Sequence, residues 1–166
     1  MDIGSGKGYP SSALSNFAPH PFVVDGVECA SMEGFLQSLK FKEPEMQAEV
    51  CKLVGRAAKF KGKKKKWWVK GNLYWQGREI DRFGLAYQQI LDRAFIELSY
   101  NTKFKKALLA TNDAVLKHSI GKRKQTDTIL TRKEFCGRLT KIRTILMAER
   151  SPLNNFIKNV KEQKRE

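Results

Sequence analysis

The chain has 166 residues, of which 41% are hydrophobic and 30% are charged, a composition typical of one soluble globular domain. No apolar run approaches the ~20 residues that a membrane-spanning helix needs, and the N-terminus MDIGSGKGYP lacks a signal-peptide pattern. The 32 Lys and Arg residues outnumber the 17 Asp and Glu residues, so the net charge is +15. We therefore expect a cytoplasmic protein with no membrane contact.

Such a positive charge attracts polyanions. Nucleic acid is the commonest partner of a surface of this kind, ahead of acidic membranes and phosphorylated small molecules. The alternative is a basic surface that is only solvated. We favour a nucleic-acid partner.

The cysteines and histidines show no pattern of a metal site or a disulfide. Cys29, Cys51 and Cys136 are odd in number and widely spaced, which predicts reduced cytosolic thiols. His20 and His118 lie far apart, with no cysteine at ligand spacing. No strand precedes the N-terminal GSGKG, so it is not a Walker A loop, and no serine lies in a nucleophile elbow. We expect neither a metal nor a cofactor.

The N-terminal part predicts an irregular lead-in, a hairpin and a helix. Residues 1–12 are rich in glycine and serine. Phe22–Val24 and Val27–Cys29 are predicted strands, because the Asp25-Gly26 pair between them suits a tight turn. Ser31 is placed to cap a helix. The apolar residues of that helix recur at helical spacing: Met32, Phe35, Leu36 and Leu39.

Glu33 falls in the first turn of that helix, on a polar face shared with Gln37 and Lys40. A carboxylate there gains ~0.3–1 kcal/mol from the helix dipole. Glu33 is therefore either a structural residue or the working acid of a site. Its neighbour Lys40 and the positive helix end predict that the carboxylate stays ionised at neutral pH.

The next segments predict a second helix and a basic, aromatic stretch. The second helix covers about residues 44–59, with an apolar stripe of Met46, Val50, Leu53, Val54 and Ala57. Residues 61–75 read KGKKKKWWVKGNLYW. Lysines attract phosphates, and aromatic rings stack on bases with ~1–3 kcal/mol per base. The alternative is a solvated lysine loop with at least one of Trp67, Trp68 and Trp75 in the core.

The rest of the chain predicts four more helices. The third is marked by Ile80, Phe83, Tyr87, Ile90, Leu91, Ala94 and Leu98, with Asp81 at its start. Asn101 caps the fourth, and Thr131 with Glu134 matches the capping box of the fifth. Asp127, in the loop 118–128, is either a turn residue or a second acid. A last helix follows Ser151-Pro152 through Val160, and 161–166 is a charged tail. The fold class is mainly α (α+β): a single helical domain with a small N-terminal hairpin.

The stretches LSNF, PFVVDG and SMEGFLQSLKFK resemble the opening of the NADAR superfamily, the YbiA-like proteins named for their association with NAD and ADP-ribose. The matching positions are Ser15, Asn16, Phe17, Gly26, Ser31, Glu33, Gln37, Lys40 and Phe41. Weaker similarity at Asn101–Phe104, 107–111, Gly137–Leu139 and Arg143 extends it over about residues 14–147. The chain departs from the family where SIGKRKQTDTILT replaces an Asp with a Trp-Gly pair, and where Arg82-Phe83 replaces Asp-Trp.

The resemblance implies an N-glycosidase that cleaves a bond between ribose C1 and a nitrogen. Family substrates are riboflavin-pathway intermediates or ADP-ribose attached to guanine in DNA. The resemblance assigns Glu33 as the carboxylate that stabilises the oxocarbenium ion, and Asp127 as the substitute for the missing acid. Further expected substrate contacts are Asn16 to ribose hydroxyls, Lys40 and Lys42 to phosphates, Phe17, Trp67, Trp68 or Trp75 to a base, and Phe83 and Asn101 at family positions.

The net charge of +15 favours removal of ADP-ribose from nucleic acid over turnover of a small vitamin precursor. Two other hypotheses remain. The first is a binding module that recognises ADP-ribose or nucleic acid without cleavage, which the missing Asp and Trp-Gly motif supports. The second is a helical nucleic-acid-binding protein whose likeness to the family is accidental.

Overall fold

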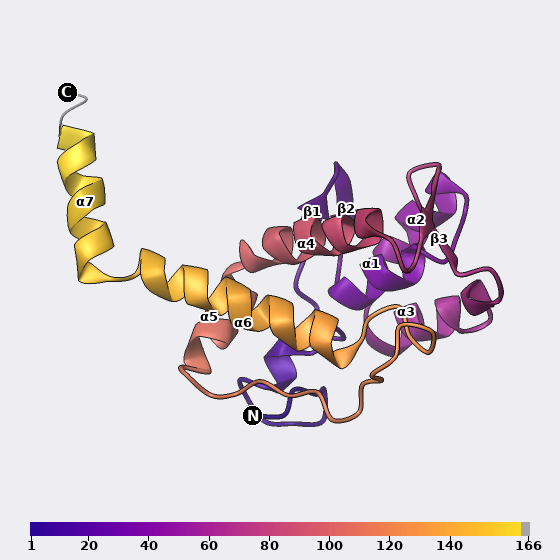
Figure 1. The fold of residues 1–166 in the computed structure, drawn as a ribbon, viewed down its shortest axis with the longest axis horizontal. Helices are drawn as coiled ribbons and strands as arrows, with labels where there is room; N and C mark the ends of the chain where they lie inside the picture. Colours follow the sequence, from indigo (N-terminus) through magenta and orange to yellow (C-terminus); the bar gives the residue numbers. More distant parts are fainter. Residues whose placement is uncertain (164–166) are drawn as a thin grey trace.

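The computed structural model describes residues 1–163, which form seven α-helices, two 3-10 turns and two separate antiparallel hairpins. The predicted mainly helical α+β class is confirmed (Figure 1). The helices are α1 (Met32–Ser38), α2 (Pro44–Cys51), α3 (Gly55–Lys63), α4 (Leu85–Ser99), α5 (Thr102–Ala110), α6 (Arg132–Glu149) and α7 (Pro152–Gln163). The strands are β1 (Phe22–Val24), β2 (Val27–Cys29), β3 (Asn72–Trp75) and β4 (Arg78–Asp81), and the 3-10 turns are η1 (Ser12–Leu14) and η2 (Trp67–Val69).

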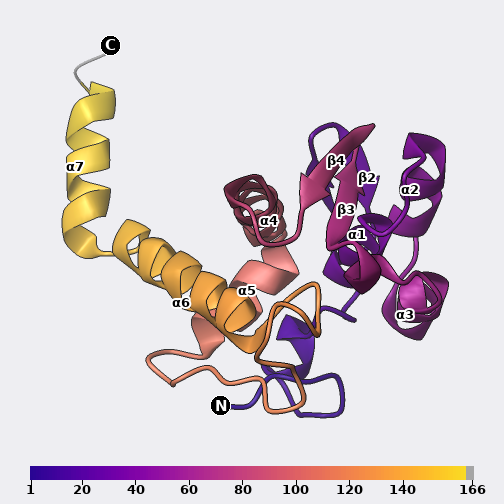
Figure 2. The same cartoon turned by 45° about the vertical axis from the view of Figure 1, so that its right-hand side comes forward.

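The elements pack in two groups around one hydrophobic core (Figure 2). Helices α4, α5 and α6 lie on one side, and the hairpins with α1, α2 and α3 lie on the other. The core is a single cluster to which α1, α4 and α6 contribute aromatic rings. Phe35 packs edge-to-face on Trp75 at 5.2 Å between ring centroids, and Phe95 lies 6.0 Å from Phe135. Burial of these rings supplies the main driving force for folding.

The first hairpin and the cap of α1 are confirmed. Phe22 pairs with Cys29 and Val24 with Val27, across a turn in which Asp25 (φ 48°) and Gly26 (φ 78°) are both left-handed. This is the geometry that an Asp-Gly pair adopts readily in a two-residue hairpin. The Ser31 hydroxyl accepts a hydrogen bond from the Gly34 N–H at 3.0 Å, as an N-cap does.

The single helix predicted for residues 44–59 was wrong, because the chain breaks after Cys51 and restarts as α3 at Gly55. The start of α1 packs against the break. The Ser31 hydroxyl donates to the Leu53 carbonyl at 2.9 Å, and a Cβ on Gly34 would lie 2.5 Å from that oxygen. The backbone at Gly55 is left-handed (φ 53°), which glycine tolerates. Met46 and Val54 of the predicted apolar stripe are exposed.

The third predicted helix begins later than expected, because residues 72–81 form a second hairpin. Leu73 pairs with Ile80 and Trp75 with Arg78. Asp81 ends β4 and accepts a hydrogen bond from the Phe83 N–H at 2.9 Å, so neither residue belongs to α4. The Gln-Gly turn between the strands is a weaker hairpin signal than Asp-Gly, which explains why the sequence did not reveal it.

The remaining boundaries largely follow the prediction. The Asn101 cap and the Thr131–Glu134 capping box are both formed. The lead-in 1–12 is irregular but packed, since Ile3 is buried in the core and Asp2 pairs with Lys117. Helix α7 starts at Pro152 as expected, with no buried residue, and runs to Gln163. Part of the predicted tail is thus helical, and residues 164–166 lie outside the described residues.

The three cysteines are free thiols, as predicted. Within residues 1–163, no helix combines the length and the apolar character needed to cross a membrane.

Candidate active-site cavity

A cavity of about 690 Å³ opens where α1, α3, η2, the 15–17 loop and the 118–130 segment meet. One wall carries residues of the N-terminal half, and the other carries the loop that precedes α6. Its polar and charged lining comprises Ser5, Ser15, Asn16, Glu33, Gln37, Lys40, Lys59, Lys63, His118, Lys122, Thr126, Asp127 and Thr128, and its apolar lining includes Phe17, Leu36, Trp67, Trp68, Ile120, Ile129 and Leu130.

Glu33 is held in this cavity by its backbone and by its neighbour one turn along. The Glu33 N–H donates to the Asn16 carbonyl at 3.0 Å, which ties the start of α1 to the 15–17 loop. The Gln37 side-chain amide donates to Glu33 Oε1 at 2.8 Å. One carboxylate oxygen therefore has a fixed partner. The other, Oε2, accepts no hydrogen bond from the described residues and is available to a ligand.

The surroundings of Glu33 shift the pKa of its carboxyl group in opposite directions. Burial raises the pKa of Glu33 above its ordinary value, and it outweighs the hydrogen bond from Gln37 and the positive charges of Lys59 and Lys40, which lower that pKa. Burial likewise lowers the pKa of Lys40, and the Glu33 charge only partly offsets this effect. Glu33 and Lys40 therefore both lie in a poorly hydrated site, where the attraction between each group and an oppositely charged ligand is stronger than in water.

A close approach of α3 to α1 brings two further lysines to the cavity. A methyl group on Gly62 would come within 1.9 Å of Gln37 Oε1, so a larger residue there would displace the amide that donates to Glu33. Lys59 lies three residues before Gly62 on α3 and Lys63 directly after it, and both lysines line the cavity. The Lys59 ammonium lies 5.9 Å from the centroid of the Phe17 ring, within the range of a cation–π contact.

Two adjacent tryptophans form an aromatic edge of the cavity. Trp67 is buried, whereas Trp68 is 53% exposed, and their rings meet edge-to-face with centroids 6.3 Å apart. The buried ring holds the exposed one in place. Such a supported, solvent-facing indole is suited to stacking on a planar group.

The opposite wall carries His118 and Asp127. His118 Nδ1 lies 2.9 Å from the Ile3 carbonyl, and its ring meets Phe135 edge-to-face with centroids 5.2 Å apart. A carbonyl accepts only, so Nδ1 carries the proton. Nε2 then remains free to exchange a proton. Asp127 lies in an exposed turn of the same wall, and its N–H donates to the Lys124 carbonyl at 3.0 Å.

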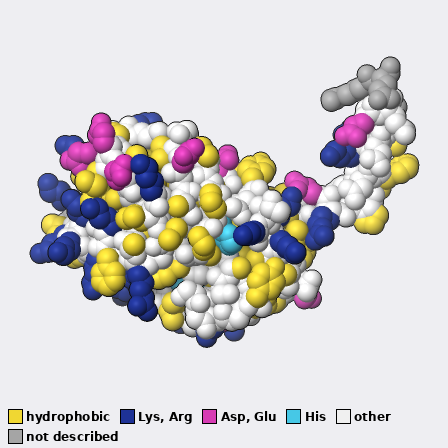
Figure 3. All heavy atoms as spheres, turned by 180° about the vertical axis from the view of Figure 1, so that it is seen from behind, with side chains coloured by type: hydrophobic (Ala, Val, Ile, Leu, Met, Phe, Trp, Pro, Cys, Tyr) yellow, Lys and Arg dark blue, Asp and Glu magenta, His cyan; other side chains and the backbone are white. Residues whose placement is uncertain are grey.

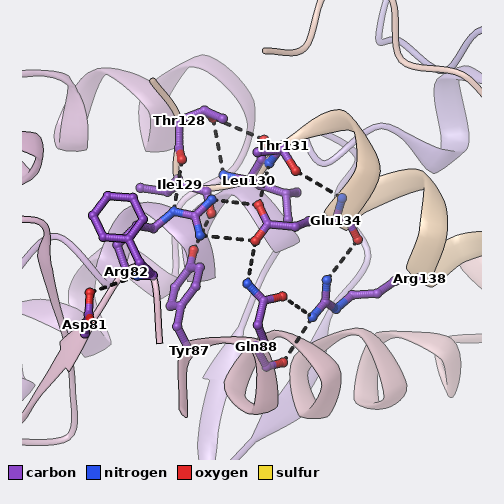
Figure 4. A network of polar contacts seen from close by, with 11 residues as sticks. Asp81, Arg82, Tyr87, Gln88, Thr128, Ile129, Leu130, Thr131, Glu134 and Arg138 are labelled. Carbon is purple, nitrogen blue, oxygen red and sulfur yellow. Dashed lines mark hydrogen bonds and ion pairs between the residues drawn. The ribbon is translucent and has the colours of Figure 1, made fainter. Parts of the chain in front are cut away.

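A buried network fixes this wall to the helical core (Figure 4). The Arg82 guanidinium donates through Nε to the Thr128 carbonyl at 3.0 Å and through its two terminal nitrogens to Glu134 at 3.1 and 2.6 Å. The Tyr87 hydroxyl donates to the Ile129 carbonyl. The Gln88 amide donates to the second oxygen of Glu134 at 2.6 Å. Residues 128 and 129 of the loop are therefore anchored by Arg82 and Tyr87, and Arg82 is itself held by Glu134 of α6.

A family model covers most of the chain. The family model described as bacteriophage protein GP30.3 matches residues 8–144. The chain belongs to this family. An uncharacterized 17.1 kDa protein from the Gp30–rIII intergenic region of Enterobacteria phage T4 is 39% identical over 149 residues, which cover 88% of this chain and 98% of that protein.

The fold also matches a solved structure. The NMR structure of the E. coli protein YbiA superposes with a TM-score of 0.60 and 18% sequence identity, over 90% of this chain and 85% of YbiA. The YbiA-like fold that the N-terminal motif predicted is thereby confirmed for this GP30.3 family member. Helix α7 lies beyond the residues that the family model matches.

The cavity of this GP30.3 family member gathers seven of the residues that the sequence proposed for a site. They are Asn16, Phe17, Glu33, Lys40, Trp67, Trp68 and Asp127. Their contact with a substrate stays a prediction. The alternative that at least one tryptophan belongs to the core is confirmed by Trp67 and Trp75. Asp127 fits both of its alternatives, since it is a turn residue that also faces the cavity.

Four proposed site residues lie elsewhere. Lys42 is exposed after α1 and does not line the cavity. Trp75 is buried in the hydrophobic core, and its indole N–H donates to Asp25 at 2.8 Å. Phe83 is exposed and packs beside Gly71. Asn101 caps α5 and donates to the Pro21 carbonyl at 3.0 Å.

The sequence missed three charged or titratable residues of the cavity: Lys59, Lys122 and His118. Lys63 belongs to the predicted basic stretch 61–75 but was not assigned to the site. The alternation of cations with small residues over residues 55–63 was a usable signal, since it places Lys59 and Lys63 about one turn apart on one face of a helix. His118 gave no such signal. Its contact with Ile3 joins positions 115 residues apart in the chain.

Proposed function

We propose that this protein is an N-glycosidase that removes ADP-ribose from a nucleobase, most specifically guanine, in nucleic acid. The observation that carries the proposal is the placement of Glu33, a half-buried carboxylate in a cavity that Lys40, Lys59, Lys63 and Lys122 also line. An acid among lysines suits a substrate with a negative diphosphate and an electron-poor sugar carbon. The cavity volume of about 690 Å³ fits a nucleotide-sized ligand.

The proposed reaction breaks the bond between ribose C1 and the base nitrogen. Positive charge develops at C1 and the ring oxygen as the bond lengthens, and the free oxygen of Glu33 stabilises that charge. The electron pair of the breaking bond goes to the leaving nitrogen, which takes up a proton. Water then adds to C1 and gives up a proton, so that the products are free ADP-ribose and the intact base.

His118 is the proposed proton carrier. Its Nδ1 is held by the Ile3 carbonyl, which leaves Nε2 for the substrate. Gly121 lies beside the ring edge that carries Nε2, and a side chain at Gly121 would collide with that edge, since its Cβ would come within 2.5 Å of Cδ2. His118 and Gly121 both line the cavity. Imidazolium Nε2–H gives its proton to the leaving nitrogen, and the neutral ring then takes a proton from the attacking water.

The lysines and aromatic rings hold the substrate in the proposed complex. Lys40 and Lys59, on the same wall as Glu33, pair with the diphosphate, because charge-assisted hydrogen bonds from ammonium groups to phosphate oxygens are strong. Asn16, beside Glu33, bonds a ribose hydroxyl. Trp68 stacks on a base, since its ring is exposed at the cavity and is supported by Trp67.

The test uses single-stranded DNA that carries one ADP-ribosylated guanine. Incubation with the protein should release free ADP-ribose and restore unmodified guanine, both measured by mass spectrometry. Glu33→Gln should abolish release, whereas Glu28→Gln, which changes an exposed acid of β2, should leave release at the wild-type rate. Turnover of a riboflavin-pathway intermediate, with no release of ADP-ribose from the DNA, would overturn the assignment of substrate.

A binding module without hydrolysis is the second candidate. The sequence SIGKRKQTDTILT, which replaces the family's acid and Trp-Gly pair, forms most of one cavity wall and favours this alternative. Calorimetry with ADP-ribose beside the hydrolysis assay separates the two candidates. Binding of ADP-ribose with no turnover of the modified DNA would favour the module.

A further inference from the structure

A strip of positive charge runs along α3 and η2 at the end of the molecule farthest from α7. Figure 3 shows Lys and Arg side chains gathered at this end. No Asp or Glu occurs between Glu49 and Glu79. The cations of the strip are all exposed, and they are Arg56, Lys59, Lys61, Lys63, Lys64, Lys65, Lys66 and Lys70. Such a strip neutralises several phosphates of a polyanion at once.

Exposed aromatic rings interrupt the basic strip. Phe60 is 64% exposed on α3, and Trp68 is 53% exposed on η2. The Lys63 ammonium lies 5.6 Å from the centroid of the Phe60 ring. Rings of this size are usually buried, so two of them in solvent among lysines have no structural explanation in the described residues. Bases of an unpaired strand stack on such rings, whereas the bases of a duplex are already stacked on one another.

The basic strip is continuous with the candidate active-site cavity. Lys59, Lys63 and Trp68 belong to the strip and also line the cavity. On the opposite rim, Lys122, Arg123 and Lys124 are exposed, and Lys122 lines the cavity. Positive charge therefore flanks the mouth of the cavity on two sides. A strand lying on the strip can place one base over the cavity while its phosphates contact lysines.

The pattern suits nucleic acid better than a lipid surface. A helix that lies in a membrane interface exposes a continuous apolar face. Over the residues of α3, Phe60 is the single large apolar side chain that is exposed, and cations surround it. Separate rings spaced between cations are the arrangement found where successive bases stack.

We propose that the basic strip of α3 and η2 binds single-stranded nucleic acid, with Phe60 and Trp68 as stacking platforms that guide a base toward the cavity. The proposal deepens the proposed function by naming the strand-binding surface and the single-stranded form of the partner. Because the proposed strand binding does not require an ADP-ribosyl group, it can be tested on unmodified DNA, independently of the proposed hydrolysis.

The experiment measures fluorescence anisotropy of a labelled, unmodified 20-nucleotide DNA strand, and of the same sequence as a duplex, over a series of salt concentrations. Phe60→Ala and Trp68→Ala are each expected to weaken single-strand binding by about 5- to 150-fold, which corresponds to one lost stacking contact. Lys64→Gln combined with Lys66→Gln should reduce the salt dependence. The unmodified protein should bind the single strand more tightly than the duplex.

Matched controls change the same residue types on another surface. Tyr100→Ala removes an aromatic ring that is 73% exposed at the end of α4, and Lys103→Gln with Lys106→Gln removes two exposed cations of α5. These variants should bind the strand like the unmodified protein. Circular dichroism melting of every variant checks the fold, which the exposed positions of Phe60 and Trp68 should preserve.

The proposal would be overturned by equal affinity for strand and duplex, by wild-type binding of both Phe60→Ala and Trp68→Ala, or by equal weakening in the control variants. Vesicles of phosphatidylserine that bind the protein more tightly than the strand would overturn it in favour of a membrane surface. A hydrolysis assay tests the two proposals separately. Strand binding without release of ADP-ribose would refute only the proposed glycosidase activity. Cleavage of free ADP-ribosyl-guanosine without strand binding would refute only the proposed role of the basic strip.

Discussion

Replacing Arg82 by methionine removes the centre of the network that anchors the cavity wall. The Arg82 side chain is fully buried, and it forms the only ion pair of Glu134 within the described residues. Methionine keeps much of the volume of arginine but leaves Glu134 without its partner and the Thr128 carbonyl without its donor. Removing one partner of a buried pair typically costs about 3–5 kcal/mol. For a chain of this length, a loss of that size lowers Tm by about 6–20 °C.

The assay is thermal unfolding followed by circular dichroism, for Arg82→Met, Glu134→Gln and the double variant. The double variant should lose less stability than the sum of the two single variants, because no charge is then left buried alone. A loss for Arg82→Met below about 1 kcal/mol, or strictly additive losses in the double variant, would refute the account of the network.

The pH dependence of the same variants provides a second check. Burial raises the pKa of Glu134, but the hydrogen bonds from Arg82, Gln88 and the Thr131 N–H outweigh it, so the folded pKa lies below the ordinary value. A depressed pKa contributes stability that is present above the unfolded pKa of ~4.3 and is lost as pH falls through the folded pKa. The difference in Tm between the unmodified protein and Arg82→Met should therefore shrink in acid.

Three further predictions concern the cavity. Glu33→Gln should have an equal or higher Tm than the unmodified protein at neutral pH, by a margin that grows as pH rises through the folded pKa, because burial raises the pKa of Glu33 and favours its neutral form in the folded state. Gly62→Ala should lower the free energy of unfolding by about 1–3 kcal/mol and weaken ADP-ribose binding in calorimetry, since a methyl group there overlaps the buried Gln37 side chain, whose amide donates to Glu33. His118→Asn should lower kcat of the proposed reaction by about 10²- to 10⁴-fold with little change in KM.

Each of these predictions has a contrary outcome. A lower Tm for Glu33→Gln than for the unmodified protein at pH 7 would mean that the carboxylate stabilises the fold. Wild-type stability of Gly62→Ala would mean that the α1–α3 contact is not tight. An increase in KM alone for His118→Asn would assign His118 to substrate binding and not to proton transfer.

Local signals predicted the parts of the fold that depend on neighbouring residues. The Asp25-Gly26 turn, the Ser31 and Asn101 caps and the Thr131–Glu134 capping box were all read from spacing, because their hydrogen bonds span at most three residues. The break between α2 and α3 was missed, since it depends on the contact of Ser31 with Leu53 across 22 positions. The hairpin of β3 and β4 was missed because its turn carries Gln76 in place of Asp or Asn.

The same distinction explains the candidate site. Glu33 and Lys40 were identified because one short motif carries both, although Lys40 lies in the turn that follows α1 and not on the helix itself. His118 and the anchoring role of Arg82 depend on packing between segments that are far apart in the chain, which no local pattern encodes. Composition could not separate the buried ring of Trp75 from the exposed ring of Trp68, so the sequence left both as candidates for stacking on a base.

The most direct measurement of the central proposal is the release of ADP-ribose from a DNA strand that carries ADP-ribosylated guanine, compared for the unmodified protein and Glu33→Gln. We expect multiple turnovers by the unmodified protein and loss of activity in Glu33→Gln, whose melting temperature is not reduced. Full activity of a folded Glu33→Gln variant would contradict the proposed role of Glu33.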